Sequence, residues 1–118
     1  MIFVIDDDLV MAECVAKACG KKKVKVFSNA IEAMKAIADG EMPELIFLDI
    51  LLIGPDGFTF LNELVSYTDT EKIPVVIVSS LDFKQRDLSV YGVVGILDKT
   101  TMLPEEILDY VEKYCEKK

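Results

Sequence analysis

The sequence contains no histidine, and it lacks several features that mark common classes of protein. Without histidine, imidazole general bases, imidazole metal ligands and serine–histidine nucleophiles are all excluded. No apolar run approaches the roughly 20 residues that a membrane-spanning helix needs, so we expect no membrane insertion. The chain starts without a basic leader, and the apolar residues 2–5 are too few for a signal peptide. We therefore expect a soluble, cytoplasmic protein.

Positive charge is also scarce. Thirteen Lys and Arg residues stand against 21 Asp and Glu residues, which gives a net charge of −8. Such an acidic surface repels phosphate backbones, so we expect no direct binding to nucleic acid. The three cysteines, Cys14, Cys19 and Cys115, form no CxxC pair. An odd number of cysteines without such a pair usually means that they are small, buried hydrophobic residues. Any chemistry must therefore use carboxylates, hydroxyls and lysine.

Short apolar runs alternate with segments of helical periodicity along the whole chain. Of the 118 residues 52% are hydrophobic, which is enough for the core of one domain. The predicted strands are residues 2–5, 24–27, 45–48, 74–78 and 93–97, and the predicted helices are residues 9–19, 30–38, 57–67, 82–89 and 104–115. Asp8 is predicted to cap the first helix, and Gly20 to follow its end.

This alternation is typical of an α/β fold with a mostly parallel sheet and helices on both faces. Right-handed crossovers leave few topologies. We predict a doubly wound, flavodoxin-like sheet of five parallel strands in the order 2-1-3-4-5. No linker or repeat interrupts the pattern, so residues 1–118 are expected to form a single domain.

Side chains that could carry chemistry follow four of the five predicted strands. Asp6 and Asp7 follow the first strand, Asp49 the third, Ser79 the fourth and Lys99 the fifth. Any one of them alone is more often a turn former, a loop hydroxyl or a solvated charge. Together they fall at the carboxyl edge of the sheet, beside the switch point between the first and third strands.

The chemistry of this set points to a metal ion and a phosphoryl group. Three neighbouring carboxylates repel one another unless a cation lies between them, and their hard oxygen atoms suit Mg²⁺. Lys99 adds a positive charge that a phosphoryl oxygen can use, and Ser79 can donate one hydrogen bond to the same group.

The chain resembles, over essentially all of its length, the receiver domain of two-component response regulators. The matching motifs are Ile5-Asp6-Asp7-Asp8 for the acidic pair, Leu48-Asp49 with the turn Asp56-Gly57 for the phosphoacceptor segment, Val78-Ser79-Ser80 for the hydroxyl-bearing strand end, and Asp98-Lys99 for the family lysine. Each motif alone is weak, whereas the set is specific.

The resemblance implies a Mg²⁺-dependent phosphoryl transfer. Asp49 would act as the nucleophile and accept a phosphoryl group from a phosphohistidine on a sensor histidine kinase or a phosphotransfer protein. Asp6, Asp7, Asp49 and the backbone carbonyl of Leu51 would bind the metal. Lys99 would help to neutralise the transferring group. The chain would be a signalling protein that catalyses only its own phosphorylation and dephosphorylation.

The resemblance also implies a switch near Ser79 and Ser80. Ser79 would donate a hydrogen bond to the phosphoryl group and pull the loop that follows it. This movement would shift a two-state surface of the fourth predicted helix and the fifth predicted strand, which binds a downstream protein target. Ile96 occupies the position of the family's switching aromatic residue, and Ile53 and Thr100 occupy positions where the family usually has proline. The output is therefore expected to travel through backbone or loop rearrangement. No output domain is expected in this chain, and a weak homodimer is left open.

Two alternatives compete with this interpretation. In the first, Asp6 is the nucleophile and Asp8 the acid/base of a haloacid-dehalogenase-type phosphatase. That interpretation leaves Asp49 without a role, lacks a late acidic pair for Mg²⁺, and needs a longer chain.

The second alternative is a receiver fold that only binds protein and is never phosphorylated. Ile53, Ile96 and Thr100 motivate it. The complete set of acidic residues and lysine argues against it, because a chain that binds no Mg²⁺ would gain stability by losing a carboxylate.

Overall fold

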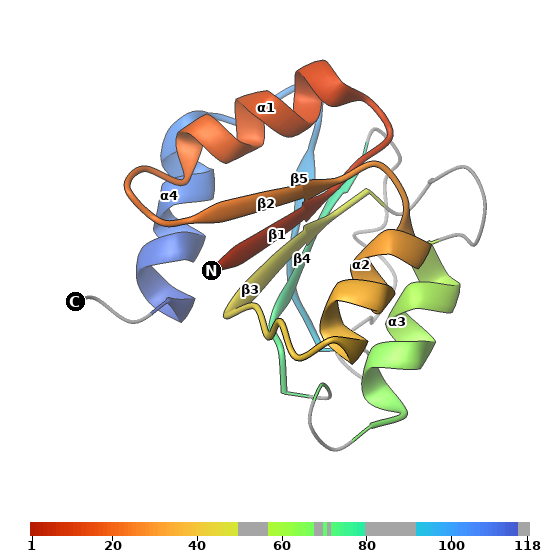
Figure 1. Ribbon diagram of the computed structural model, residues 1–118. Helices are drawn as coiled ribbons and strands as arrows, with labels where there is room; N and C mark the ends of the chain where they lie inside the picture. Colours follow the sequence, from red (N-terminus) through yellow and green to blue (C-terminus); the bar gives the residue numbers. More distant parts are fainter. Residues whose placement is uncertain (50–56, 68–69, 71, 80–91, 116–118) are drawn as a thin grey trace.

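The computed structural model describes residues 1–49, 57–67, 70, 72–79 and 92–115 (Figure 1). Within these residues strands and helices alternate, except that β4 is followed by β5. The strands are β1 (Ile2–Ile5), β2 (Val24–Phe27), β3 (Leu45–Leu48), β4 (Val75–Ser79) and β5 (Val93–Asp98). The helices are α1 (Leu9–Ala18), α2 (Ala30–Ala38), α3 (Gly57–Val65) and α4 (Pro104–Tyr114). The helix predicted over residues 82–89 lies outside the described residues.

All five strands are parallel, and their order is β2-β1-β3-β4-β5, which confirms the predicted sheet. In β1, Ile5 is aligned with Phe27 of β2 and with Leu48 of β3. The three strands therefore end at the same level. Ser79 of β4 is in turn aligned with Asp98 of β5, so the carboxyl ends form one edge.

The sheet has a hydrophobic core on each face. Residues of α2 and α3 pack with Phe3 and Ile5 of β1 on one face, and residues of α1 and α4 pack with Ile2 and Val4 on the other (Figure 1). Every residue of β1, β3 and β4 is buried, as expected for strands that are covered on both faces. Because both faces are covered, the sequences of these strands are continuous apolar runs and do not alternate between apolar and polar residues.

The first helix begins and ends at the residues that the sequence indicates. The Asp8 carboxylate accepts hydrogen bonds from the backbone N–H groups of Val10 (3.1 Å) and Met11 (3.2 Å). Gly20 has a φ of 73°, a left-handed conformation that favours glycine after a helix. The helix ends at Ala18, one residue earlier than predicted, and Cys19 is its C-cap.

Other boundaries differ from the prediction by one or two residues. Strand β4 covers Val75–Ser79 rather than residues 74–78, and α4 ends at Tyr114 rather than at residue 115. Helix α3 ends at Val65 rather than at residue 67, and side chains beyond it bind the last carbonyls: the Ser66 hydroxyl donates to Asn62 and the Thr70 hydroxyl to Leu64. Strand β5 extends one residue further, to Asp98, because it stays paired with Ser79.

The cysteine prediction is correct for two of the three residues. Cys19 and Cys115 are buried between α1 and α4, and burial raises the pKa of the Cys19 thiol to about 12. Cys14 is exposed, contrary to the prediction, because it faces outward from α1.

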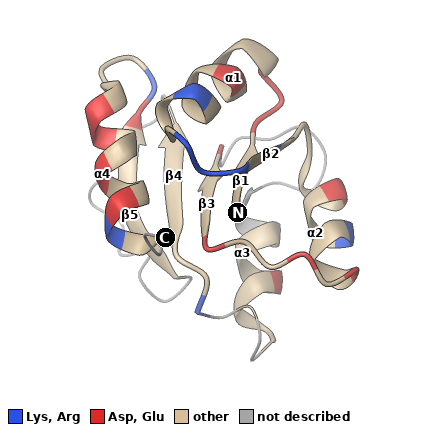
Figure 2. Ribbon diagram, turned by 60° about the vertical axis from the view of Figure 1, so that its left-hand side comes forward, with Lys and Arg blue, Asp and Glu red and all other residues tan. Residues whose placement is uncertain are grey.

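Charge is unevenly spread over the molecule. Figure 2 shows acidic positions along α4 and in the connection from β1 to α1, with basic positions where α1 passes into β2. None of the helices in the described part of the chain has the length and apolar character needed to cross a bilayer.

Candidate functional site

Backbone hydrogen bonds carry the sheet pairing one residue beyond the strands and so position the polar side chains at its carboxyl edge. The N–H of Asp6 donates to the carbonyl of Phe27 (3.0 Å), and the N–H of Asp49 donates to that of Ile5 (2.9 Å). The N–H of Lys99 donates to the carbonyl of Ser79 (3.1 Å). Asp6, Asp49 and Lys99 are therefore fixed to the ends of neighbouring strands, although they lie just beyond the strands that precede them.

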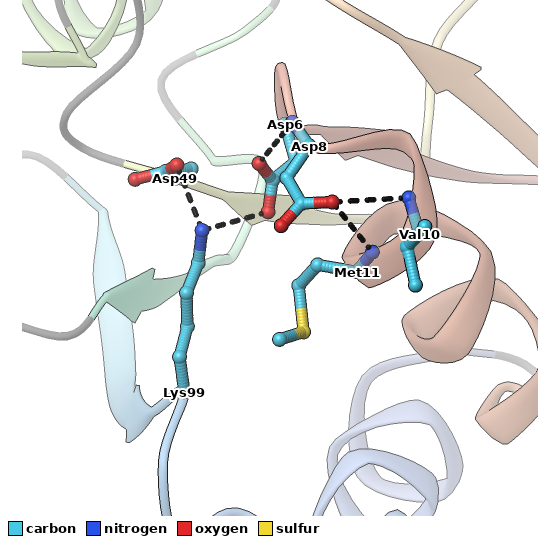
Figure 3. Close-up of polar contacts among 6 residues, drawn as sticks. All are labelled: Asp6, Asp8, Val10, Met11, Asp49 and Lys99. Atoms are coloured by element: carbon cyan, nitrogen blue, oxygen red, sulfur yellow. Dashed lines mark hydrogen bonds and ion pairs between the residues drawn. The ribbon is translucent and has the colours of Figure 1, made fainter.

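The Lys99 ammonium bridges two carboxylates at this edge (Figure 3). Its Nζ lies 3.0 Å from Oδ2 of Asp6 and 2.9 Å from Oδ2 of Asp49. Asp6 is 3% exposed and Asp49 is 6% exposed. Because water screens buried charges poorly, this bridge is a strong electrostatic feature.

The protonation equilibria reflect this arrangement. The pKa of Asp6 is raised, chiefly because burial disfavours the carboxylate, and the nearby Asp49 charge adds to the effect; the hydrogen bond from the Asp8 N–H and the Lys99 ammonium oppose it. Burial alone would lower the pKa of Lys99, but its contacts with Asp49 and Asp6 outweigh burial and raise it. Lys99 therefore stays protonated at neutral pH.

Asp7 completes an acidic cluster with Asp6 and Asp49. One carboxylate oxygen from each residue lies within 4.8 Å of the others, and Asp7 is exposed while its two neighbours are buried. Three carboxylates and one ammonium leave two negative charges, which a divalent cation would neutralise. The oxygen-only donor set and its open side suit Mg²⁺, which keeps several of its water ligands.

Ser79 lies at the same edge and is almost fully buried, with 1% of its surface exposed. Ile96, two residues before the end of β5, is half-buried and packs against the core beneath α2 and α3. Leu51, Ile53 and Ser80 lie outside the described residues.

A turn after β5 is a feature of the site that sequence reasoning missed. The Asp98 carboxylate accepts hydrogen bonds from the backbone N–H (2.8 Å) and the hydroxyl (2.7 Å) of Thr100. These contacts form a turn with Lys99 at its centre. The backbone N–H of Lys99 itself donates to the carbonyl of Ser79. An Asp followed two residues later by Thr is a signal for such a side-chain-stabilised turn, and it could have been recognised.

Comparison with known proteins gives a consistent result. Residues 2–112 match the family model described as the response regulator receiver domain. The crystal structure of the receiver domain of NtrX from Brucella abortus is similar over all of both chains, with a TM-score of 0.83 and 26% identity. The magnesium-bound receiver domain of the sensor histidine kinase PA1611 from Pseudomonas aeruginosa has the same fold, with a TM-score of 0.77 and 18% identity over 96% of this chain and 94% of that one.

A curated relative matches a shorter segment. The response regulator PleD from Caulobacter vibrioides is 40% identical over 47 residues, which are 40% of this chain and 10% of PleD. The matched segment thus spans about one tenth of the length of that relative.

Proposed function

Because the chain belongs to the response regulator receiver domain family of two-component signalling, we propose that it is a phosphorylation-dependent switch with Asp49 as the phosphoacceptor. The observation that carries this proposal is the position of Asp49, which shares the Lys99 ammonium with Asp6 and also belongs to the acidic cluster. A nucleophile placed between a fixed cation and a metal-binding edge is suited to phosphoryl transfer, which depends mainly on positioning and charge neutralisation.

In the proposed reaction, an Asp49 oxygen attacks the phosphorus of a phosphohistidine on a sensor histidine kinase or a phosphotransfer protein. The P–N bond breaks, its electron pair goes to the imidazole, and an acyl phosphate forms on Asp49. Lys99 provides positive charge next to the new phosphoryl oxygens. When bound by Asp6, Asp7, Asp49 and the carbonyl of Leu51, Mg²⁺ would supply further charge neutralisation.

The phosphoryl group also has a proposed route to a binding surface. Ser79 lies at the end of β4, where its hydroxyl would donate a hydrogen bond to the phosphoryl group, and Ser80 would move with it. Lys99 would exchange part of its contact with Asp49 for the phosphoryl oxygens. Ile96, on the adjacent strand β5, would respond by a shift in packing rather than by an aromatic rotamer change, and the altered surface would bind a downstream target protein.

The phosphatase alternative is weakened by the position of Asp8. Its carboxylate accepts hydrogen bonds from the first turn of α1, so it serves as the helix cap (Figure 3). The alternative of a binding module without phosphorylation stays open for the test below.

We further propose that residues 1–118 are one receiver domain, which acts in the cytoplasm.

The test is the intact mass after incubation with acetyl phosphate and Mg²⁺. We expect one added phosphoryl group on the wild type, none on Asp49→Asn, and none when a chelator is present. Asp109→Asn, which alters an exposed carboxylate on α4, is the matched control and should be phosphorylated like the wild type. No adduct on the wild type would favour the binding module, and an adduct on Asp49→Asn would place the acceptor elsewhere.

A further inference from the structure

An apolar groove runs between α2 and α3, which lie side by side on one face of the sheet (Figure 1). It has a volume of about 420 Å³, and its apolar lining includes Ile31, Met34 and Ala38 from α2 and Phe60 from α3. A second hollow of about 400 Å³ shares Met34 and Ala38 with it. The two hollows adjoin at these two side chains, and we refer to them together as the depression on the face of the sheet away from α1 and α4.

Large apolar side chains are exposed along this depression. Ile31 is 53% exposed, Met42 is 43% exposed and Tyr67 is 56% exposed. Ile31 lines the first hollow, and Met42 and Tyr67 line the second. Exposed apolar groups gathered around a hollow mark a surface that is suited to association with another protein.

The charges on the two walls of the groove are opposite in sign. Lys35 on α2 and Glu63 on α3 both line the first hollow, and both are exposed. Among the described residues neither makes an ion pair. Figure 2 shows charged positions of both signs on α2 and an acidic one on α3. One unpaired charge of each sign therefore faces the groove from opposite walls.

This pattern is self-complementary under two-fold symmetry. With a two-fold axis along the groove, α2 of one copy lies on α3 of the other, and Lys35 of each copy meets Glu63 of its mate. An isologous contact of this kind contains every pair twice. The same operation brings the apolar walls together and offers the exposed Ile31 side chain to the groove of the mate.

We propose that this groove is a homodimer interface, in which Lys35 and Glu63 pair between copies around an apolar centre formed by Ile31, Met34 and Ala38. The net charge of −8 opposes the approach of two copies, so the dimer is weak and forms at high protein concentration. The inference does not rest on phosphoryl transfer, because it concerns the unphosphorylated chain and a surface made by other residues.

Reversal of the charges at Lys35 and Glu63 tests the proposal directly. Sedimentation equilibrium, over a concentration series that reaches the millimolar range, measures the dimer dissociation constant of each variant. Lys35→Glu and Glu63→Lys should each raise the dimer dissociation constant by about tenfold or more, because the symmetry places each substitution in two contacts. The double variant Lys35→Glu/Glu63→Lys should return the constant to the wild-type value. All four proteins should be folded, since both positions are exposed.

The matched control is Glu13→Lys/Lys17→Glu on α1, which exchanges two exposed charges on the opposite side of the sheet and should leave the constant unchanged. A wild type that stays monomeric throughout the series would overturn the proposal and leave the groove to a different partner. A dimer that single reversals do not weaken, or that the double exchange does not restore, would also overturn it, because the interface would then lie elsewhere.

Discussion

The Lys99 ammonium lies 2.9 Å from the Asp49 carboxylate, although 50 positions separate the two residues in the chain. The sheet brings them together, because β3 and β5 flank β4 and both end at the same edge. Lys99 also contacts Asp6 at 3.0 Å, so one cation holds two buried carboxylates. This bridge links the stability of the fold to the chemistry proposed for the site.

Removal of the bridging cation should destabilise the metal-free protein. In Lys99→Ala the Asp6 and Asp49 carboxylates remain buried and face each other without the ammonium, so the free energy of unfolding should fall by about 2–4 kcal/mol. Mg²⁺ should restore most of this loss. Urea denaturation with Mg²⁺ or with a chelator measures both effects, and Lys17→Ala on α1 is the exposed control. A loss as small as that of the control would contradict the prediction.

Neutralisation of Asp6 should have the opposite effect. Burial raises the folded-state pKa of Asp6 above its ordinary value of 3.8, so the folded protein binds this proton more tightly than the unfolded chain does. The contribution of Asp6 to stability therefore falls as pH rises from the unfolded pKa to the folded one.

At neutral pH without metal, Asp6→Asn should thus raise the free energy of unfolding by about 1 kcal/mol and should lose the stabilisation by Mg²⁺. Urea denaturation between about pH 4 and pH 7 should show the decline with pH in the wild type and a smaller decline in the variant. A variant that is less stable than the wild type at pH 7 would show that the Lys99 contact outweighs burial.

The turn after Lys99 makes proline unfavourable at position 100. The Thr100 N–H donates to Asp98, and proline lacks this donor, so Thr100→Pro should lower the free energy of unfolding by about 1–3 kcal/mol. Thr100→Val keeps the N–H and loses only the hydroxyl contact, and it should cost about 0.5–1 kcal/mol. Thermal denaturation of both variants should show that Thr100→Pro loses more stability than Thr100→Val. A proline variant as stable as the wild type would show that the turn accepts the family residue.

The Tyr110 side chain of α4 packs against strand β5 at Gly95. A Cβ at Gly95 would overlap the ring and hydroxyl of Tyr110, so the ring would have to move in Gly95→Ala. We expect a loss of about 1–2 kcal/mol. In the Tyr110→Ala background the same substitution should cost much less, so denaturation of the two single variants and the double variant should show non-additivity. Equal costs in both backgrounds would contradict this account of the contact.

The architecture was predictable because its determinants are local. A short continuous apolar run bounded by turn residues, such as residues 45–48, is typical of a strand covered on both faces, and Asp8 is of a residue type that favours the start of a helix. Once the strands are parallel, the residues that follow them must meet at one edge. Asp6, Asp7, Asp49 and Lys99 could therefore be grouped without coordinates.

The details that could not be predicted depend on how side chains meet in three dimensions. Sequence reasoning assigned Lys99 to a phosphoryl oxygen, whereas the resting structure pairs it with two carboxylates, because their desolvation favours a shared cation. The end of α3 at Val65 depends on a hydroxyl contact from Thr70, which lies beyond the helix. The charged walls of the groove between α2 and α3 come from separate helices, and only the packed fold places them opposite each other.

The identity of the carboxylate that receives the phosphoryl group is the central claim, and it can be read directly. After incubation with acetyl phosphate and Mg²⁺, borohydride reduces an aspartyl phosphate to homoserine, and peptide mass spectrometry locates the changed residue. We predict homoserine at position 49 alone, and only when Mg²⁺ is present. Homoserine at position 6, or labelling that persists in Asp49→Asn, would contradict the account.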